Sequence, residues 1–148
     1  MLNLQNSVYD CSILGLSRHH TDRQGNLTVV ENSLTVPFEV RRVYYLYDVP
    51  GGVSRGGHAH HMQYQLIVAA SGSFSVTLDD GCVKRTFLLN HPYQGLLVPP
   101  GIWNTLEDFS SGAVCMVLAS DYYDETDYIR EYDEFLALKQ QHMKHIRK

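Results

Sequence analysis

Two histidines, His58 and His60, are separated by one small residue in a strand-like segment. Side chains alternate between the two faces of a β-strand, so both imidazoles would lie on the same side of a sheet. Histidine titrates near neutral pH and can act as a general base, as a proton carrier or as a metal ligand. An Arg-Gly-Gly turn that begins at Arg55 directly precedes the pair. A lone histidine in a strand is usually structural, but this pair beside an arginine favours a chemical site.

The composition is that of one globular domain. The chain has 148 residues, a net charge of −4 and 44% hydrophobic residues, which suffices for a single core across residues 1–148. The negative charge argues against a nucleic-acid partner. No apolar run approaches the roughly 20 residues that cross a bilayer, and the first ten residues do not resemble a signal peptide. We therefore expect a cytoplasmic protein with no membrane partner.

The three cysteines are odd in number and lack the spacing of a metal site. Cys82 and Cys115 stand in strand-like runs, so we expect both to be buried thiols.

Short strand-like segments follow one another through most of the chain. They are separated by turn signals at 22–26, 71–72, 79–81, 99–101 and 110–112, and this spacing predicts an all-β sandwich or barrel. A first strand is expected from Ser7 onward. From about Glu131, apolar residues recur at helical spacing, which predicts one C-terminal helix and tail at 131–148, packed on the outside of the barrel.

The segment 38–49 is rich in Val and Tyr and strongly favours a strand, yet neither of its faces is plainly apolar. Alternation places Arg42 and Tyr44 on one face, and Arg41 and Tyr45 on the other. We expect one face to line a polar cavity and the other to meet a partner surface. We assign Arg42 and Tyr44 to the cavity, although the alternation alone leaves the opposite parity open.

The spacing of Gly52, the histidine pair, Gln65 and Gly72 resembles the first signature of the cupin superfamily. This resemblance implies a cupin fold, a double-stranded β-helix or jelly-roll barrel whose mouth holds a metal or a substrate. A cupin normally has Glu at the position of Gln65, and usually a fourth ligand, His, at the position of Asn104. Amide oxygens are poor ligands for zinc, iron or copper. We therefore expect no metal and no other cofactor.

Longer stretches resemble the sugar 3,4-ketoisomerases that act on dTDP-4-keto-6-deoxyglucose. They are PFEVRRVYYLYDVP, RGGHAH, LDDG, PPGIW and VLASDYYDETDYIREYDEF, spread over residues 22–135. The resemblance implies that a nucleotide-linked 4-keto-6-deoxy sugar is isomerised to the 3-keto sugar by metal-free proton transfer through an enediol(ate), in deoxysugar biosynthesis. The RGxH segment is also similar to that of the dTDP-sugar 3,5-epimerases, which are the nearest rival. A non-catalytic sugar-nucleotide-binding cupin is the second rival.

The resemblance implies that His58 and His60 carry the proton chemistry, without saying which of them takes the proton from C3. Tyr44 is a candidate to move protons between the two sugar oxygens. The configuration of the product at C4 is left open by the same residues.

The candidates for substrate binding share a predicted position near the cavity. Arg55 is expected at a phosphate or at sugar oxygens, and Trp103 at the thymine ring or, equally well, in the core. Arg23 is displaced by one position from the arginine that family members commonly carry directly before Gly25, so its contact with the diphosphate is a weaker expectation. The remaining candidates are Arg42, Gln65 and Asn104.

The resemblance also implies a homodimer in which the N-terminal strands, residues 1–31, are exchanged between subunits. An exchanged hairpin would pair with an exposed strand edge and would remove the aggregation hazard of unpaired backbone groups.

Overall fold

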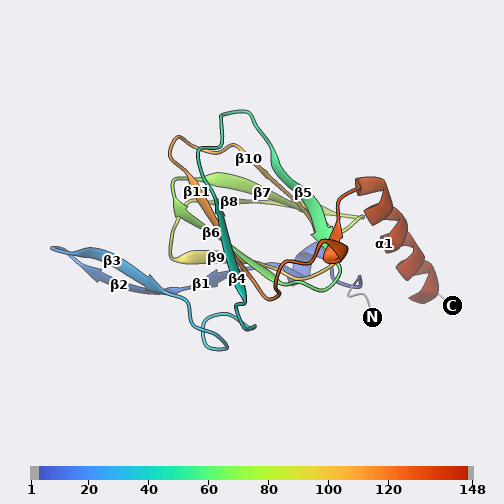
Figure 1. The fold of residues 1–148 in the computed structure, drawn as a ribbon, viewed down its shortest axis with the longest axis horizontal. Helices are drawn as coiled ribbons and strands as arrows, with labels where there is room; N and C mark the ends of the chain where they lie inside the picture. The colour runs from blue at the N-terminus through green and yellow to red at the C-terminus, as the bar shows by residue number, and fades with distance from the viewer. Residues whose placement is uncertain (1–3, 147–148) are drawn as a thin grey trace.

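The computed structural model describes residues 4–146, with side-chain exposure for residues 4–143, and shows two antiparallel five-stranded sheets packed face to face (Figure 1). The first sheet contains, in spatial order, β1 (Ser12–Gly15), β9 (Gln94–Val98), β6 (Gln65–Ser71), β11 (Val114–Ala119) and β4 (Arg42–Leu46). The second contains β12 (Tyr128–Ile129), β5 (Arg55–His60), β10 (Trp103–Glu107), β7 (Phe74–Asp79) and β8 (Lys84–Leu89). This jelly-roll arrangement confirms the predicted fold class.

The main core lies between the two sheets. Ile67 and Ala69 of β6 face Phe74, Val76 and Leu78 of β7 across this space. The strand β6 is buried on both sides, because its alternate residues belong to a second apolar cluster on the outside of the first sheet. The segment around Val36 covers that cluster.

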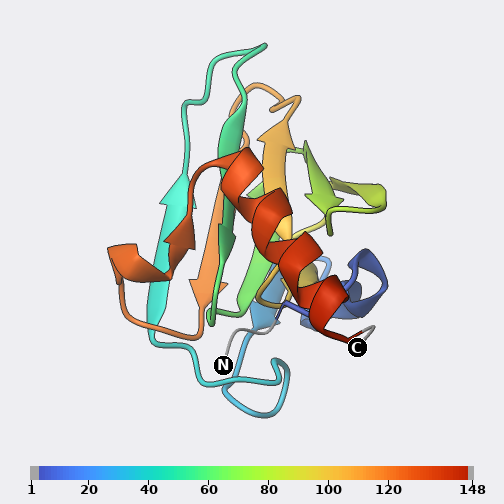
Figure 2. The same cartoon turned by 90° about the vertical axis from the view of Figure 1, so that its right-hand side faces the viewer.

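A single helix, α1 (Tyr132–Ile146), crosses the outer face of the second sheet (Figure 2). Phe135 of the helix is fully buried against Ala59 of β5 and Ile129 of β12. The predicted C-terminal helix and its position outside the barrel are thus confirmed. Because α1 covers the outward residues of β5, the inward residues of that strand are directed at the space between the sheets.

The hairpin of β2 (Ser17–Thr21) and β3 (Gly25–Val29) forms a separate two-stranded sheet and extends away from the barrel (Figure 1). All five residues of β2 are exposed, and so is Leu27 of β3. A two-stranded hairpin is marginally stable by itself in water. In the single chain, the β2–β3 hairpin therefore leaves apolar side chains such as Leu27 exposed to solvent.

Two local expectations were wrong. The segment from Ser7 begins with a short 3₁₀ helix, Val8–Asp10, which Ser7 caps through its side chain, and the first strand starts only at Ser12. Cys82 is exposed, unlike Cys11 and Cys115, because it follows the Asp-Gly turn and precedes the start of β8. Within residues 4–146, no helix is long and apolar enough to cross a membrane.

Gly95 of β9 allows this strand to approach Leu66 of β6. A Cβ atom at position 95 would lie 2.7 Å from the Leu66 side chain. We expect Gly95→Ala to lower the free energy of unfolding by about 1–3 kcal/mol, because Leu66 is fully buried and has little room to move. Gly51→Ala is the matched control, since no atom lies within 4 Å of its added methyl. Urea unfolding at one protein concentration checks both; equal midpoints would contradict the packing argument.

Candidate active site

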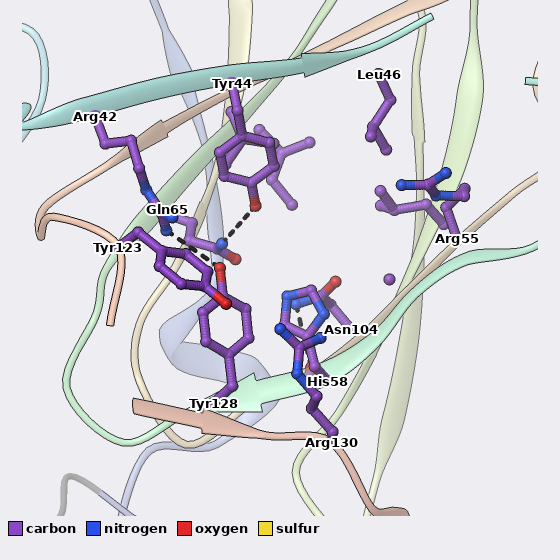
Figure 3. Close-up of a pocket in the computed structure, with 14 residues that line it drawn as sticks. Arg42, Tyr44, Leu46, Arg55, His58, Gln65, Asn104, Tyr123, Tyr128 and Arg130 are labelled. Atoms are coloured by element: carbon purple, nitrogen blue, oxygen red, sulfur yellow. Dashed lines mark hydrogen bonds between the residues drawn. The ribbon is translucent and has the colours of Figure 1, made fainter. Parts of the chain in front are cut away.

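A cavity of about 290 Å³ opens between the two sheets (Figure 3). Six strands contribute inward-facing side chains to it, together with the segment that links β11 to α1. Its walls consist of Arg42, Tyr44, Leu46, Arg55, Gly56, His58, Gln65, Ile67, Asn104, Leu106, Val117, Tyr123, Tyr128 and Arg130.

The Arg-Gly-Gly segment lies within β5 and is not the turn expected from the sequence, and its two glycines let β5 run close to β10. Gly56 and Gly57 have φ of +82° and +73°, a region that residues with a Cβ atom rarely adopt. A Cβ on Gly56 would also lie 3.0 Å from the side-chain oxygen of Asn104. The close approach pairs His58 with Asn104 across the two strands, so both side chains reach the cavity.

His58 lies in the cavity wall, and its Nε2 is buried without a hydrogen-bond partner among the residues that the structure describes. Burial, followed by the neighbouring His60 and the cation of Arg130, lowers the pKa of His58 from 6.5 to about 4. The ring is therefore neutral at pH 7 and its nitrogen can accept a proton.

His60 lies next to His58 but is more deeply buried, with 3% of its surface exposed. The two rings meet edge to face, with centroids 5.1 Å apart. Asp127 lies 3.0 Å from Nδ1 of His60. Although burial opposes ionisation of Asp127, hydrogen bonds from His60 and from the backbone amides of Met62 and Gln63 keep its pKa below the usual value. Asp127 thus holds the Nδ1 edge of the imidazole.

Sequence reasoning missed Asp127 as part of the site. It lies inside the long acidic, tyrosine-rich stretch after β11, 67 positions from His60. No local spacing connects two residues so far apart. The pairing of β12 with β5 brings them together, since Tyr128 lies opposite His60.

Two glutamine amides face the other nitrogen of His60. The Nε2 atoms of Gln65 and Gln63 lie 3.3 and 3.4 Å from His60 Nε2. Amide NH₂ groups are donors, so they occupy the side of the imidazole that a metal ion would need. With Asn104 as the remaining cupin-like position, these residues do not fit a metal centre.

The inward face of β4 carries Arg42 and Tyr44, while Arg41, Val43 and Tyr45 are exposed. The structure therefore decides the parity that alternation left open. Figure 3 shows the Tyr44 hydroxyl directed toward Gln65, which donates a hydrogen bond to it over 3.0 Å. Burial raises the pKa of Tyr44 to about 12, so the phenol keeps its proton at neutral pH.

Three guanidinium groups line the cavity, and they differ in their hydrogen-bond partners. Arg42 donates hydrogen bonds to Gln63 and to the Tyr128 hydroxyl, at 3.0 and 3.2 Å. Arg130 is paired with Glu125 through two bonds of 2.6 and 2.9 Å. The guanidinium of Arg55 is exposed and has no hydrogen bond or ion pair within the described part of the chain. Arg55 is therefore the cation most readily available to a ligand.

The tyrosine and arginine residues after β11 were also missed, namely Tyr123, Tyr128 and Arg130. Their only sequence signal was membership of the long motif that resembles the ketoisomerases. They reach the cavity because the chain returns along β5 after the 3₁₀ helix Glu125–Asp127.

Two predicted binding residues lie outside this cavity. Trp103 faces outward from β10 and packs against Tyr132 and Phe135 of α1, a position that does not suit stacking on a base in the cavity. Its neighbour Asn104 takes the inward position instead, because adjacent strand residues face opposite sides. Arg23 lies at the exposed turn of the β2–β3 hairpin, so it does not reach the cavity of its own chain.

The fold and the site can be compared with known proteins. The family model FdtA (WxcM-like, C-terminal) matches residues 9–140. The chain is 49% identical over 114 residues to a TDP-4-oxo-6-deoxy-α-D-glucose-3,4-oxoisomerase of Aneurinibacillus thermoaerophilus, covering 77% of this chain and 82% of that protein.

Solved structures agree with this match. A 3,4-ketoisomerase from Helicobacter canadensis is 40% identical, with a TM-score of 0.85 over 88% of this chain and 98% of the other. A second structure is a His-to-Asn mutant of the 3,4-ketoisomerase QdtA from Thermoanaerobacterium thermosaccharolyticum, in complex with TDP-4-keto-6-deoxyglucose. It is 34% identical, with a TM-score of 0.88 over 91% of this chain and 97% of the other.

More distant structures share the fold alone. A dTDP-4-dehydrorhamnose 3,5-epimerase from Bacillus anthracis is 20% identical, with a TM-score of 0.71 over 86% of this chain and 81% of the other. The match to the family model over most of the chain, together with the identity to the Aneurinibacillus enzyme, is decisive: this chain belongs to the FdtA family of WxcM-like, C-terminal domains.

Proposed function

We propose that this chain isomerises a TDP-linked 4-keto-6-deoxy sugar to the 3-keto sugar, as a sugar 3,4-ketoisomerase of deoxysugar biosynthesis. The observation that carries this function is the Nε2 of His58, which has no hydrogen-bond partner in the described part of the chain, in a cavity that also contains the Tyr44 phenol and the exposed Arg55 guanidinium. A base, a proton donor and an anion-binding group are what the isomerisation needs. The curated relative and the solved ketoisomerases support the same activity.

In the first half of the reaction, His58 takes the proton from C3 of the sugar. Of the two histidines, His58 alone lines the cavity, while His60 lies behind it. The electron pair of the broken C–H bond forms a double bond between C3 and C4, and the carbonyl electron pair moves onto the C4 oxygen. That oxygen takes the proton of Tyr44, which gives the enediol.

In the second half, the C3 hydroxyl returns a proton to Tyr44 as the C3 carbonyl forms. C4 takes a proton from the protonated His58. Atoms and charges balance without an oxidant or reductant. His60, held by Asp127, packs edge to face against His58 and fixes the position of that ring in this proposal.

Arg55 binds the diphosphate of the nucleotide in this proposal. Its guanidinium is exposed at the cavity and lacks an internal partner in the described chain. A bidentate contact with phosphate oxygens matches guanidinium geometry. Gln65, Asn104 and Arg42 complete the sugar end of the site.

The protein acts as a homodimer in this proposal, with the β2–β3 hairpin exchanged between subunits. The hairpin extends from the barrel and is almost entirely exposed. The strand β4 is the last strand of its sheet, and Tyr45 within it and Tyr47 just after it are more than half exposed. A hairpin from a second copy would cover this edge and could bring Arg23 to the neighbouring cavity. The cytoplasmic location expected above stays a prediction.

His58→Asn and His60→Asn are each expected to lower turnover about 100-fold or more, since His58 is the base and His60 is the ring that packs against it and positions it. Incubation with dTDP-4-keto-6-deoxyglucose in D₂O, followed by NMR, measures both the isomer formed and deuterium uptake at C3. His91→Asn, on the loop before β9, serves as a control. A wild-type protein that binds TDP but exchanges no C3 proton would identify a non-catalytic binding protein, and exchange at C5 would identify an epimerase.

The pH profile tests His58 as the base. Protonation of His58 abolishes its ability to take the C3 proton, and its pKa is lowered to about 4. We therefore expect kcat/KM to stay level as the pH falls through 6.5 and to decline only at pH values near 4, because kcat/KM reports groups of the free enzyme. A decline centred near 6.5 would assign the limiting protonation to a different group.

The assembly can be tested by replacing residues 17–29 with a short Gly-Ser linker, which removes the hairpin and keeps β1. We expect a monomer by light scattering and weaker TDP binding by titration, because part of each cavity wall would come from the other chain. Arg23→Ala in the full chain should weaken TDP binding while leaving the dimer intact. A hairpin-free protein that stays dimeric and binds TDP normally would contradict the exchange.

A further inference from the structure

Gln65 lies where the cavity wall meets His60. Its side chain is buried, and its amide nitrogen is 3.0 Å from the Tyr44 hydroxyl and 3.3 Å from His60 Nε2. An amide NH₂ group has two hydrogens and can donate to both atoms. The direction of these two hydrogen bonds decides whether Tyr44 can give its proton to a ligand.

The direction can be derived from Arg42, which can only donate hydrogen bonds. Arg42 is 3.0 Å from Oε1 of Gln63, so the oxygen of that amide faces Arg42. The NH₂ group of Gln63 consequently faces His60 Nε2. A donor in this position requires a bare, accepting nitrogen on His60.

Asp127 leads to the same result from the opposite side of the ring. Its carboxylate also accepts the amide of Met62, and its pKa lies below the usual value, so it acts as an acceptor. His60 Nδ1 must then carry the hydrogen, and the neutral ring presents a lone pair at Nε2. Two independent neighbours thus define one tautomer of His60.

With His60 Nε2 as an acceptor, Gln65 must turn its NH₂ group toward that nitrogen. The same NH₂ group then donates to the oxygen of Tyr44. A phenol oxygen that accepts from Gln65 must direct its own hydrogen elsewhere. Of the two amides, only that of Gln65 contacts Tyr44 and lines the cavity (Figure 3).

We infer that Gln65 is a positioning residue that holds Tyr44 as a proton donor toward the cavity, and so directs the Tyr44 proton to the C4 oxygen of the sugar. The inference rests on the proposed function for the identity of that oxygen. It gives the amide at position 65 a defined role: a carboxylate there could only accept, so it would take the hydrogen of Tyr44 for itself.

Gln65→Glu tests the direction of the hydrogen bond, since it changes the polarity and keeps the size. We expect kcat to fall about 100-fold, the scale of a lost general acid, with little change in KM. The profile of kcat should also acquire a decline with rising pH as the introduced carboxyl ionises, a limb that the wild type lacks. Gln140→Glu on the exposed face of α1 is the matched charge control.

Gln65→Met tests whether the direction of the hydrogen bond to Tyr44 matters or only the presence of a side chain of this size. It also provides a second variant in case Gln65→Glu does not fold. It removes both hydrogen bonds without adding charge, so we expect a loss of only about 10-fold and an unchanged pH profile. In a Tyr44→Phe background most of this loss should disappear, because residues that act as a unit are not additive. TDP binding verifies that each variant is folded.

Three results would overturn the inference. They are a Gln65→Glu variant with wild-type kcat and pH profile, a rise in KM at unchanged kcat, and a Gln65→Met loss that persists fully without the Tyr44 hydroxyl. The tautomer of His60 can be read by ¹⁵N NMR of the wild type without any turnover. A hydrogen on Nε2 would refute the inference, whereas a hydrogen on Nδ1 in a protein that fails to isomerise would refute only the proposed function.

Discussion

The buried hydrogen bond between His60 and Asp127 is the constraint on which the site depends. It joins the barrel strand β5 to the segment that leaves the barrel after β11, and it does so where the imidazole is almost wholly removed from water. A buried polar group without a partner costs a few kcal/mol. The partners of His60 must therefore be supplied by the fold, and each of them in turn constrains the next side chain.

This constraint explains why uncharged amides surround His60. Gln63 accepts a hydrogen bond from the cation of Arg42 and, like Gln65, donates one to His60. The two amides therefore satisfy the side of His60 opposite Asp127 without adding charge. Carboxylates at these positions would stabilise a protonated His60 and would favour a bound cation. The amides instead donate to His60 and to Tyr44, and Tyr44 itself lines the cavity.

The three arginines of the cavity wall differ in whether their guanidinium groups are held by other side chains. The pairing of Arg130 with Glu125 and the hydrogen bonds of Arg42 hold two cations in fixed positions at the cavity wall. Arg55, the first residue of β5, lines the cavity with an exposed guanidinium. Burial, the neighbouring His60 and the nearby arginines together lower the pKa of His58, so the environment of the cavity keeps this imidazole uncharged at pH 7.

The sequence by itself determined the strand and turn pattern, the external helix and the histidine pair, because these depend on periodicities within a few residues. It also indicated His58, Tyr44 and Arg55 as candidate site residues, because each stands in a recognisable local motif. Only the tertiary structure decided that Arg42 and Tyr44 face inward, that Trp103 packs under α1, and that Asp127 reaches His60. Each of these depends on which sheet face is covered, or on strand pairs far apart in the chain, and no local spacing records either.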